Sequence, residues 1–358
     1  FMITVLSAYI LGRREVFGWE AALFACLIPT TKGIMGPAFL VPVAMGLLFI
    51  PLSLFLAFNF RTGWSYLVLF IITCFLLSIH AVTAVGLAVI LTPYILLNLK
   101  GNFKHSLGLT LAIAIPFLVP FPWIFDLLLP TFKSLFNPTP LASYIDFPSV
   151  IHTYGYAPIL FCLLGAFVLG VRGGRKGYGL ALGLLTMLLV LVAYFTFHHG
   201  VPVLYQRGLI YMMLMMSIVA GAGLMGVKKL KPPALGYTLC VVLIGVTLAF
   251  AIPARQNTPY YQMINEQDYE AFVWIRDNID ENYDKAILDP WKATAFTAIT
   301  GKKVFARIHA YPTPSSDKAY EFLRGGCTDT AFLRENTISI VYTKSDCNNA
   351  DLTPVREN

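Results

Sequence analysis

The chain has 358 residues, of which 57% are hydrophobic and 13% are charged. In an ordinary soluble protein about a quarter of the residues are charged, so this composition excludes that class. Residues 1–253 hold 14 Lys and Arg against 4 Asp and Glu, whereas residues 254–358 hold 12 against 15. The basic excess therefore lies in the apolar part, where it is typical of the cytoplasmic loops of a membrane protein. It does not indicate a nucleic-acid ligand.

The first 253 residues are expected to form a polytopic α-helical membrane bundle. A helix needs about 20 mostly apolar residues to cross the hydrocarbon core. Ten segments are predicted, at 1–11, 17–29, 38–58, 64–80, 81–98, 106–125, 156–171, 178–197, 208–227 and 233–252. The first is too short to span and begins with Phe1 rather than Met, so we expect a fragment that lacks its N-terminal part.

Lys and Arg alternate between the connections and predict the orientation. The basic side carries Arg13, Arg14, Arg61, Lys100, Lys104, Arg172, Arg175, Lys176, Lys228, Lys229 and Lys231. The other side carries only Lys32, Lys133 and Arg207 before residue 254. The rich side is expected to be cytoplasmic. The protein would then be a multi-pass cell-membrane protein with an extracytoplasmic C-terminal domain.

The longest outer connection, at 126–155, is rich in proline but keeps short apolar runs. Proline prevents one regular helix, so short interfacial helices along the outer leaflet are expected there. A plain linker is the alternative.

Residues 254–358 are expected to form a small α/β domain. Helices are predicted at 266–279, 290–301 and 316–326, and strands at 285–289, 302–308 and 337–343. This alternation favours a small parallel sheet. No glycine-rich phosphate loop follows a strand, so nucleotide binding is not expected.

Cys327 and Cys347 are the only cysteines of this domain. An oxidising exterior allows them to form a disulfide, which we expect, with two free thiols as the alternative. No metal-ligand spacing occurs anywhere in the sequence, so these residues imply no metal.

Three short motifs lie near the start of the C-terminal domain: WIR at 274–276, DP at 289–290 and TGK at 300–302. Together with the stretches at 36–42 and 78–85, it resembles the GT-C superfamily of membrane glycosyltransferases. The resemblance implies transfer of a sugar from a polyprenyl-phosphate donor to an extracytoplasmic acceptor, which could be a glycan, a lipid or a protein.

The same resemblance implies a hexosyltransferase of the mannosyltransferase-like or an uncharacterised type. Oligosaccharyltransferase activity is not expected, because LDPWKATAF stands where those enzymes carry a WWDYG-type motif. Members of the superfamily carry a catalytic acidic residue in their first outer loop. We expect this fragment to begin after that loop and therefore to lack the residue. No cofactor is evident, although a divalent metal could bind in that missing part.

Cations at the outer side are candidates for binding the donor phosphate. Arg207 suits a bidentate phosphate contact, and His198, His199 and Tyr205 lie near it in the sequence. Lys32 is the sole charge of the 30–37 connection. The alternatives are a headgroup-anchored loop for the first group and a snorkelling lysine for Lys32.

Catalytic candidates are few. Asp126 and Asp146 are the outward carboxylates of the apolar part, and His80 stands between two apolar helices. Each could activate an acceptor hydroxyl, but loop carboxylates are common and a lone histidine is often a satisfied turn residue. Two other functions stay open: a secondary transporter or flippase-like protein, and a non-catalytic envelope protein that displays its C-terminal domain.

Overall fold

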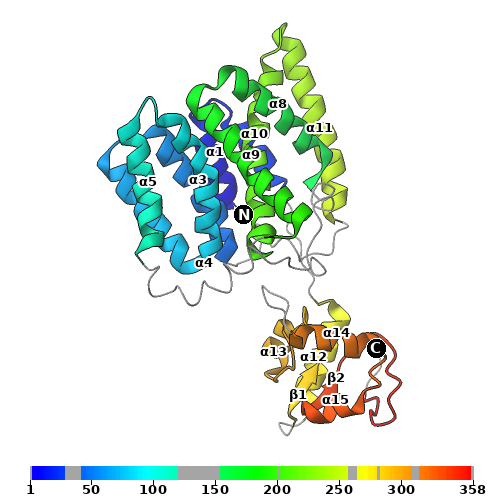
Figure 1. Ribbon diagram of the computed structural model, residues 1–358. Coiled ribbons are helices and arrows are strands. Elements are labelled where there is room, and N and C mark those ends of the chain that lie inside the picture. Colours follow the sequence, from blue (N-terminus) through cyan, green and yellow to red (C-terminus); the bar gives the residue numbers. More distant parts are fainter. Residues whose placement is uncertain are drawn as a thin grey trace. The chain divides into compact units, whose positions relative to one another are not determined.

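The computed structural model describes residues 2–28, 42–119, 154–199, 202–256, 264–279, 283–307 and 314–355. Its contacts divide the chain into two units, Phe1–Thr258 and Pro259–Asn358, drawn in Figure 1. The sequence boundary after Pro253 falls inside the last helix of the first unit, which continues to Gln256.

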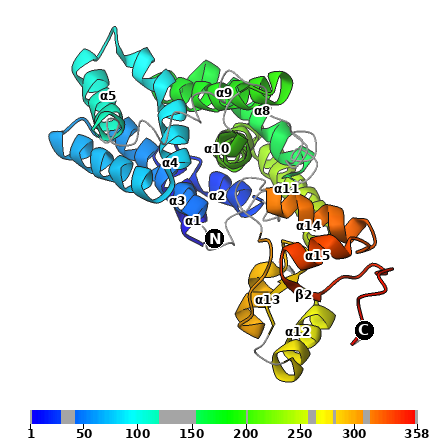
Figure 2. The ribbon, with the colours of Figure 1, turned by 60° about the horizontal axis from the view of Figure 1, so that its bottom comes forward.

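The first unit is helical. Its described helices are α1 (Met2–Arg13), α2 (Gly18–Cys26), α3 (Pro42–Asn59), α4 (Gly63–Asn98), α5 (Phe103–Leu118), α8 (Tyr156–Arg172), α9 (Gly174–Phe197), α10 (Pro202–Lys228) and α11 (Pro233–Gln256). Figure 2 looks along α10, which contacts α1, α2, α3, α4, α8, α9 and α11. Every side chain from Leu209 to Met215 is buried, as expected for a central helix that is apolar all round.

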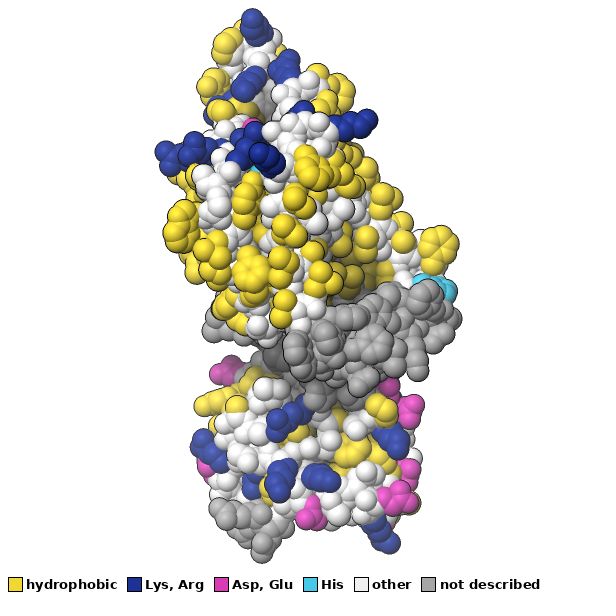
Figure 3. All heavy atoms as spheres, turned by 60° about the vertical axis from the view of Figure 1, so that its left-hand side comes forward, with side chains coloured by type: hydrophobic (Ala, Val, Ile, Leu, Met, Phe, Trp, Pro, Cys, Tyr) yellow, Lys and Arg dark blue, Asp and Glu magenta, His cyan; other side chains and the backbone are white. Residues whose placement is uncertain are grey.

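The outer faces of this unit are apolar. Leu160, Leu163 and Phe167 are exposed along α8, and hydrophobic side chains cover the middle of the unit in Figure 3. Among the described helices, three are long and apolar enough to cross a bilayer: Gly63–Asn98, Gly174–Phe197 and Leu204–Lys228. The prediction of a membrane protein is therefore supported, while the count of about ten spans stays a prediction.

Helix α4 folds back on itself at His80, whose backbone is not helical (φ −156°, ψ 86°). Near one end of α4, Tyr66 Oη lies 2.7 Å from Nδ1 of His105. Near the other end, the Ile95 carbonyl accepts a hydrogen bond of 2.7 Å from Ser106, the neighbour of His105. A straight helix would separate residues 66 and 95 by about 43 Å. The two limbs are therefore antiparallel, and the prediction of two helices with His80 between them is confirmed.

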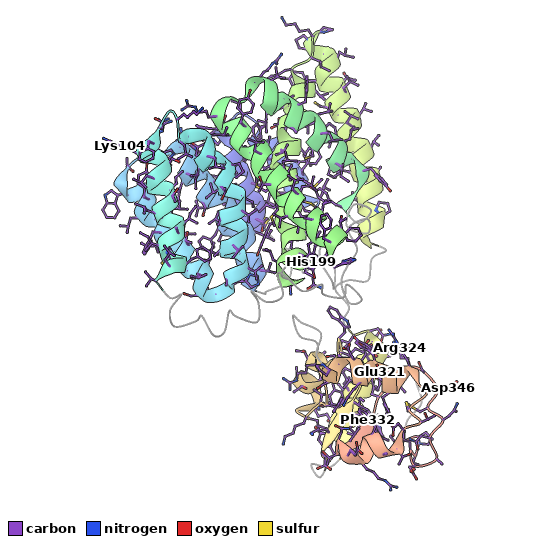
Figure 4. The ribbon with its side chains drawn as sticks, in the orientation of Figure 1. Lys104, His199, Glu321, Arg324, Phe332 and Asp346 are labelled. Carbon is purple, nitrogen blue, oxygen red and sulfur yellow. A yellow bond between two sulfur atoms is a disulfide. The ribbon has the colours of Figure 1, made fainter. Side chains whose placement is uncertain are left out.

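The basic connections gather at one end of this unit. Lys176 at the start of α9 lies 2.9 Å from Oδ1 of Asn59 and 3.4 Å from a carboxylate oxygen of Glu15. At the junction of α10 and α11, Lys228 lies 3.4 Å from Glu20. Figure 3 shows this cluster of Lys and Arg, and Figure 4 labels Lys104 in it. The positive side predicted from the sequence is thus one physical surface.

The second unit contains α12 (Glu266–Asn278), β1 (Lys285–Ile287), α13 (Ala293–Thr300), α14 (Pro314–Arg324), α15 (Thr330–Glu335) and β2 (Ile338–Val341). Strands β1 and β2 pair in parallel, as predicted. The third predicted strand, at 302–308, was wrong in the part that the structure describes: it forms only an isolated bridge between Val304 and Ala286. The chain bends at Phe305, directly after this bridge, so no further pairs form.

Two features stabilise the second unit. Asn265 and Asp268 form a reciprocal capping box at the start of α12. Asp268 is buried, and its carboxylate accepts hydrogen bonds from Lys292 (2.6 Å) and Tyr342 (2.5 Å), which joins α12 to α13 and to the segment after β2. Cys327 and Cys347 are joined by a disulfide with the sulfur atoms 1.98 Å apart.

Candidate functional site

Tyr211 lies at the meeting point of three helices. Its ring is fully buried between Gly46 of α3 and Gly86 of α4. A Cβ added at either glycine would lie 2.9 Å from a ring carbon, too close for any other residue type without a shift. The Tyr211 hydroxyl bonds to Thr83 Oγ1, which lies 2.7 Å from Nδ1 of His80. A chain of polar groups thus runs from the centre of the bundle to the bend of α4.

Arg207 precedes Tyr211 by one turn, so both residues lie on the same face of α10. Only 6% of the Arg207 surface is exposed, and among the described residues its Nη1 has no hydrogen-bond partner. The guanidinium is within electrostatic range of His80 and Tyr211. A buried donor that is left unpaired costs several kcal/mol when it is charged. An added hydrogen-bond acceptor would satisfy this donor, and an anion satisfies a guanidinium best.

This site lies at the end of the bundle opposite the basic connections. Helix α9 begins at that basic end beside Lys176 and ends at His198, and α10 returns from there to Lys228. The described carboxylates of the first unit, Glu15 and Glu20, both lie at the basic end, paired with lysines. Within the described residues of this unit, no carboxylate is therefore available to neutralise Arg207.

The other predicted phosphate ligands occupy two different settings. Tyr205 is buried and stacks on Tyr194 of α9, with ring centroids 4.9 Å apart. His198 and His199 are exposed at the end of α9, where Figure 4 labels His199. Their role in phosphate binding stays a prediction.

Three further candidates, Lys32, Asp126 and Asp146, lie outside the described residues, as does all but the end of the 126–155 connection. No group of three or more His, Cys, Asp or Glu side chains that could hold a metal ion is found among the described residues.

Thr83 and Tyr211 were not predicted from the sequence. The available signals were modest: Thr83 follows His80 by three residues, and Tyr211 follows Arg207 by four, each the spacing of one helical turn. The packing of Tyr211 against two glycines from distant helices was not visible in the sequence.

No family model matches this sequence, and no curated protein matches it. Its structure is similar to the oligosaccharyltransferase AglB from the archaeon Archaeoglobus fulgidus, solved with an inhibitory peptide and a dolichol-phosphate. The TM-score is 0.63 at 12% identity, over 94% of this chain and 56% of that one. The chain has the fold of this oligosaccharyltransferase.

Two other structures of the Archaeoglobus fulgidus oligosaccharyltransferase agree. The apo form gives a TM-score of 0.62 at 11% identity, over 94% of this chain and 57% of that one. A form tethered through a disulfide to an acceptor peptide containing the NVT sequon gives 0.57 at 11% identity, over 94% and 56%. This chain spans a little over half the length of these proteins.

The predicted similarity to GT-C-type membrane glycosyltransferases is therefore confirmed for the fold. The sequence pattern favoured mannosyltransferase-like members, whereas these matching structures are oligosaccharyltransferases. At 11–12% identity the likeness concerns the fold alone, so it does not choose between these activities.

Proposed function

We propose that this chain is part of an integral-membrane glycosyltransferase that moves a sugar from a polyprenyl-phosphate donor to an extracytoplasmic acceptor. The observation that carries the proposal is the buried Arg207 guanidinium with an unpaired Nη1, at the end of the bundle away from the basic connections. The fold supports the same conclusion, because a protein of this fold was solved with a dolichol-phosphate.

The basic end is assigned to the cytoplasm by the positive-inside rule. Arg207 then lies at the outer leaflet, where a lipid-linked donor presents its phosphate. The C-terminal unit is assigned to the same outer side, because its disulfide between Cys327 and Cys347 suits an oxidising compartment.

The proposed reaction breaks the bond between the sugar C1 and the phosphate oxygen. A nucleophilic atom of the acceptor forms the new bond to C1, and its proton passes to a base. The phosphate keeps the electron pair of the broken bond and gains negative charge. Arg207 would contact this phosphate, so its interaction strengthens as the donor bond breaks. His80, linked through Thr83 to Tyr211, Asp126 and Asp146 stay candidates for the base.

The donor site can be tested without knowledge of the acceptor. The full chain is placed in nanodiscs, and binding of fluorescent polyprenyl phosphate is compared for wild type, Arg207→Gln and Arg207→Lys. A charged hydrogen bond is worth about 1.5–3 kcal/mol, so Arg207→Gln should weaken binding by roughly ten- to a hundredfold, with Arg207→Lys in between. Arg172→Gln is the matched control, since Arg172 is exposed at the basic end.

Equal binding by wild type and Arg207→Gln would overturn the assignment of Arg207. A transport function predicts a different result: uptake of a labelled sugar or lipid by sealed vesicles, without cleavage of the donor. The transferase proposal requires cleavage of labelled polyprenyl-phosphate sugar that depends on Arg207.

A further inference from the structure

The second unit contains an open hollow of about 380 Å³, whereas Arg207 belongs to the first unit. It is formed where β1 meets the extended segment 302–307. The backbones are held together by bonds from the Ala286 amide to the Lys303 carbonyl (3.0 Å) and from the Phe305 amide to the Ala286 carbonyl (2.8 Å). The walls are thus fixed by main-chain hydrogen bonds.

Three cations line this hollow: Lys285, Lys303 and Arg307. Residues 259–358 carry 15 Asp and Glu against 11 Lys and Arg, so a wall with three cations and no carboxylate runs against the composition of the unit. None of the three forms an ion pair within the described residues, in contrast to Lys292, which lies 2.6 Å from Asp268. The Lys285 ammonium donates a hydrogen bond of 3.4 Å to the Asn336 carbonyl, whereas Lys303 and Arg307 are exposed cations. The hollow therefore offers positive charge that the described residues do not neutralise, and an anion is the ligand that fits it.

The hollow also has an apolar wall and a hydroxyl. Phe305 lines it, and its ring is held edge-on by Phe332, which Figure 4 labels, with centroids 5.3 Å apart. Ser315 adds a hydroxyl from the residue after the start of α14. An aromatic face beside a few polar groups is the usual construction of a small-molecule site. A volume of about 380 Å³ exceeds what one phosphate or carboxylate group fills, which leaves room for a ring beside Phe305.

We propose that this hollow binds an acidic sugar, with its phosphate or carboxylate held by Lys303 and Arg307 and its ring against Phe305. Binding itself does not depend on the transferase chemistry. The further assignment of this sugar to the acceptor rests on the proposed function, because the acceptor is the substrate that a soluble extracytoplasmic unit would meet.

The test uses the full chain in nanodiscs with the Arg207→Gln substitution, so that the proposed donor site does not contribute. Calorimetric titrations with glucose 6-phosphate, glucuronate and neutral glucose serve as probes. We expect saturable binding of at least one anionic sugar, at least about tenfold tighter than glucose, and a loss of about tenfold in affinity in Lys303→Gln/Arg307→Gln. A preference for phosphate or carboxylate identifies the source of the anion.

The matched control is Lys318→Gln/Arg334→Gln, which removes the same charge from exposed positions of the same unit. Phe305→Leu should weaken binding of the anionic sugar but not of inorganic phosphate. The proposal is overturned if the anionic sugars bind no better than glucose, or if the control pair weakens binding as much as the Lys303/Arg307 pair. Loss of donor binding in the Arg207 variants with intact sugar binding here would separate the two sites.

Discussion

Removing the Asp268 carboxylate is expected to destabilise the second unit strongly. The Asp268 side chain is 2% exposed, and Lys292 is 14% exposed at 2.6 Å from it. The same carboxylate accepts from the Tyr342 hydroxyl (2.5 Å) and, through the capping box, from the Asn265 amide (3.0 Å). In Asp268→Ala, a cation, a hydroxyl and a backbone N–H would all lose their acceptor.

Breaking a buried ion pair by removing one partner costs about 3–5 kcal/mol. Lys292 keeps some access to water, so the lower end, about 3 kcal/mol, applies to Asp268→Ala. This corresponds to roughly a hundredfold increase in the opening of the unit. Asp268→Asn keeps an acceptor for Tyr342 but leaves Lys292 without a counter-charge, so it should fall between Asp268→Ala and wild type.

Hydrogen exchange of the full chain, read by mass spectrometry on peptides from α12 and β2, measures this opening. The matched control is Asp277→Asn on the same helix, where the carboxylate is about half exposed and pairs only with the exposed Arg276. The control should leave the exchange rates unchanged. If Asp268→Ala protects these peptides as well as Asp277→Asn does, the reasoning from burial and hydrogen bonding is refuted.

The pH dependence provides a second readout. Burial raises the pKa of Asp268, but the hydrogen bonds from Lys292, Tyr342 and Asn265 lower it further, so its net position is below the ordinary value. Burial and the neighbouring carboxylate raise the pKa of Tyr342, which therefore stays a donor. The stability from Asp268 is present above its unfolded pKa, about 3.9, and is lost as the pH falls through the lower folded pKa. The difference between wild type and Asp268→Asn should shrink below about pH 4.

Three other substitutions test the packing. Gly165→Leu should cost about 1–3 kcal/mol of stability in detergent, because a Cβ there would overlap the Val219 carbonyl on α10; Gly170→Leu, with open space around it, is the thermal-unfolding control. Cys347→Ser opens a disulfide that closes a span of 20 residues, so hydrogen exchange near α15 should rise by an amount equivalent to about 3 kcal/mol. Tyr211→Phe should lower thermal stability by about 1 kcal/mol, since the buried hydroxyl of Thr83 loses one of its two hydrogen-bond partners and keeps only His80.

Much of the first unit could be predicted because a bilayer restricts both the length of apolar helices and the positions of charged residues. Apolar length gives the helices, and the positions of Lys and Arg give the end at which they meet. The bend at His80 was predictable because two apolar runs meet at one polar residue. The limits of the helices were less accessible: α10 begins at Pro202, six residues before the predicted start, because proline suits a first helical turn.

The second unit was harder to predict because short strands depend on partners that are distant in the sequence. The run at 302–308 was predicted to be a strand, yet within its described residues 302–307 only Val304 forms a bridge, since the chain bends at Phe305. Helix α15 was missed because six residues carry little periodicity, and its start is set by the Asp329 side chain, which accepts from the Phe332 amide.

The candidate site was only partly visible for a related reason. Arg207 stands out in the sequence because a cation amid apolar residues needs an explanation, whatever its partners are. Thr83 comes from α4 and Tyr211 lies one turn after Arg207 on α10, and residue types with no charge leave no such signal. Thr83 and Tyr211 read as ordinary helix residues until the bend at His80 and the glycines of α3 and α4 place them beside each other.

Arg207 differs from the cations at the basic end of the helical unit in its burial and in its lack of an ion pair among the described residues. At the basic end, Lys176 and Lys228 are partly exposed and have carboxylate partners, so their charges are stabilised both by water and by an ion pair. Arg207 is buried, and its Nη1 is unpaired. A fold that needed only packing at this position would gain stability from an apolar side chain of similar volume. The proposed donor phosphate would supply the acceptor that Nη1 lacks among the described residues, and this accounts for a cation at a position where packing alone favours an apolar side chain.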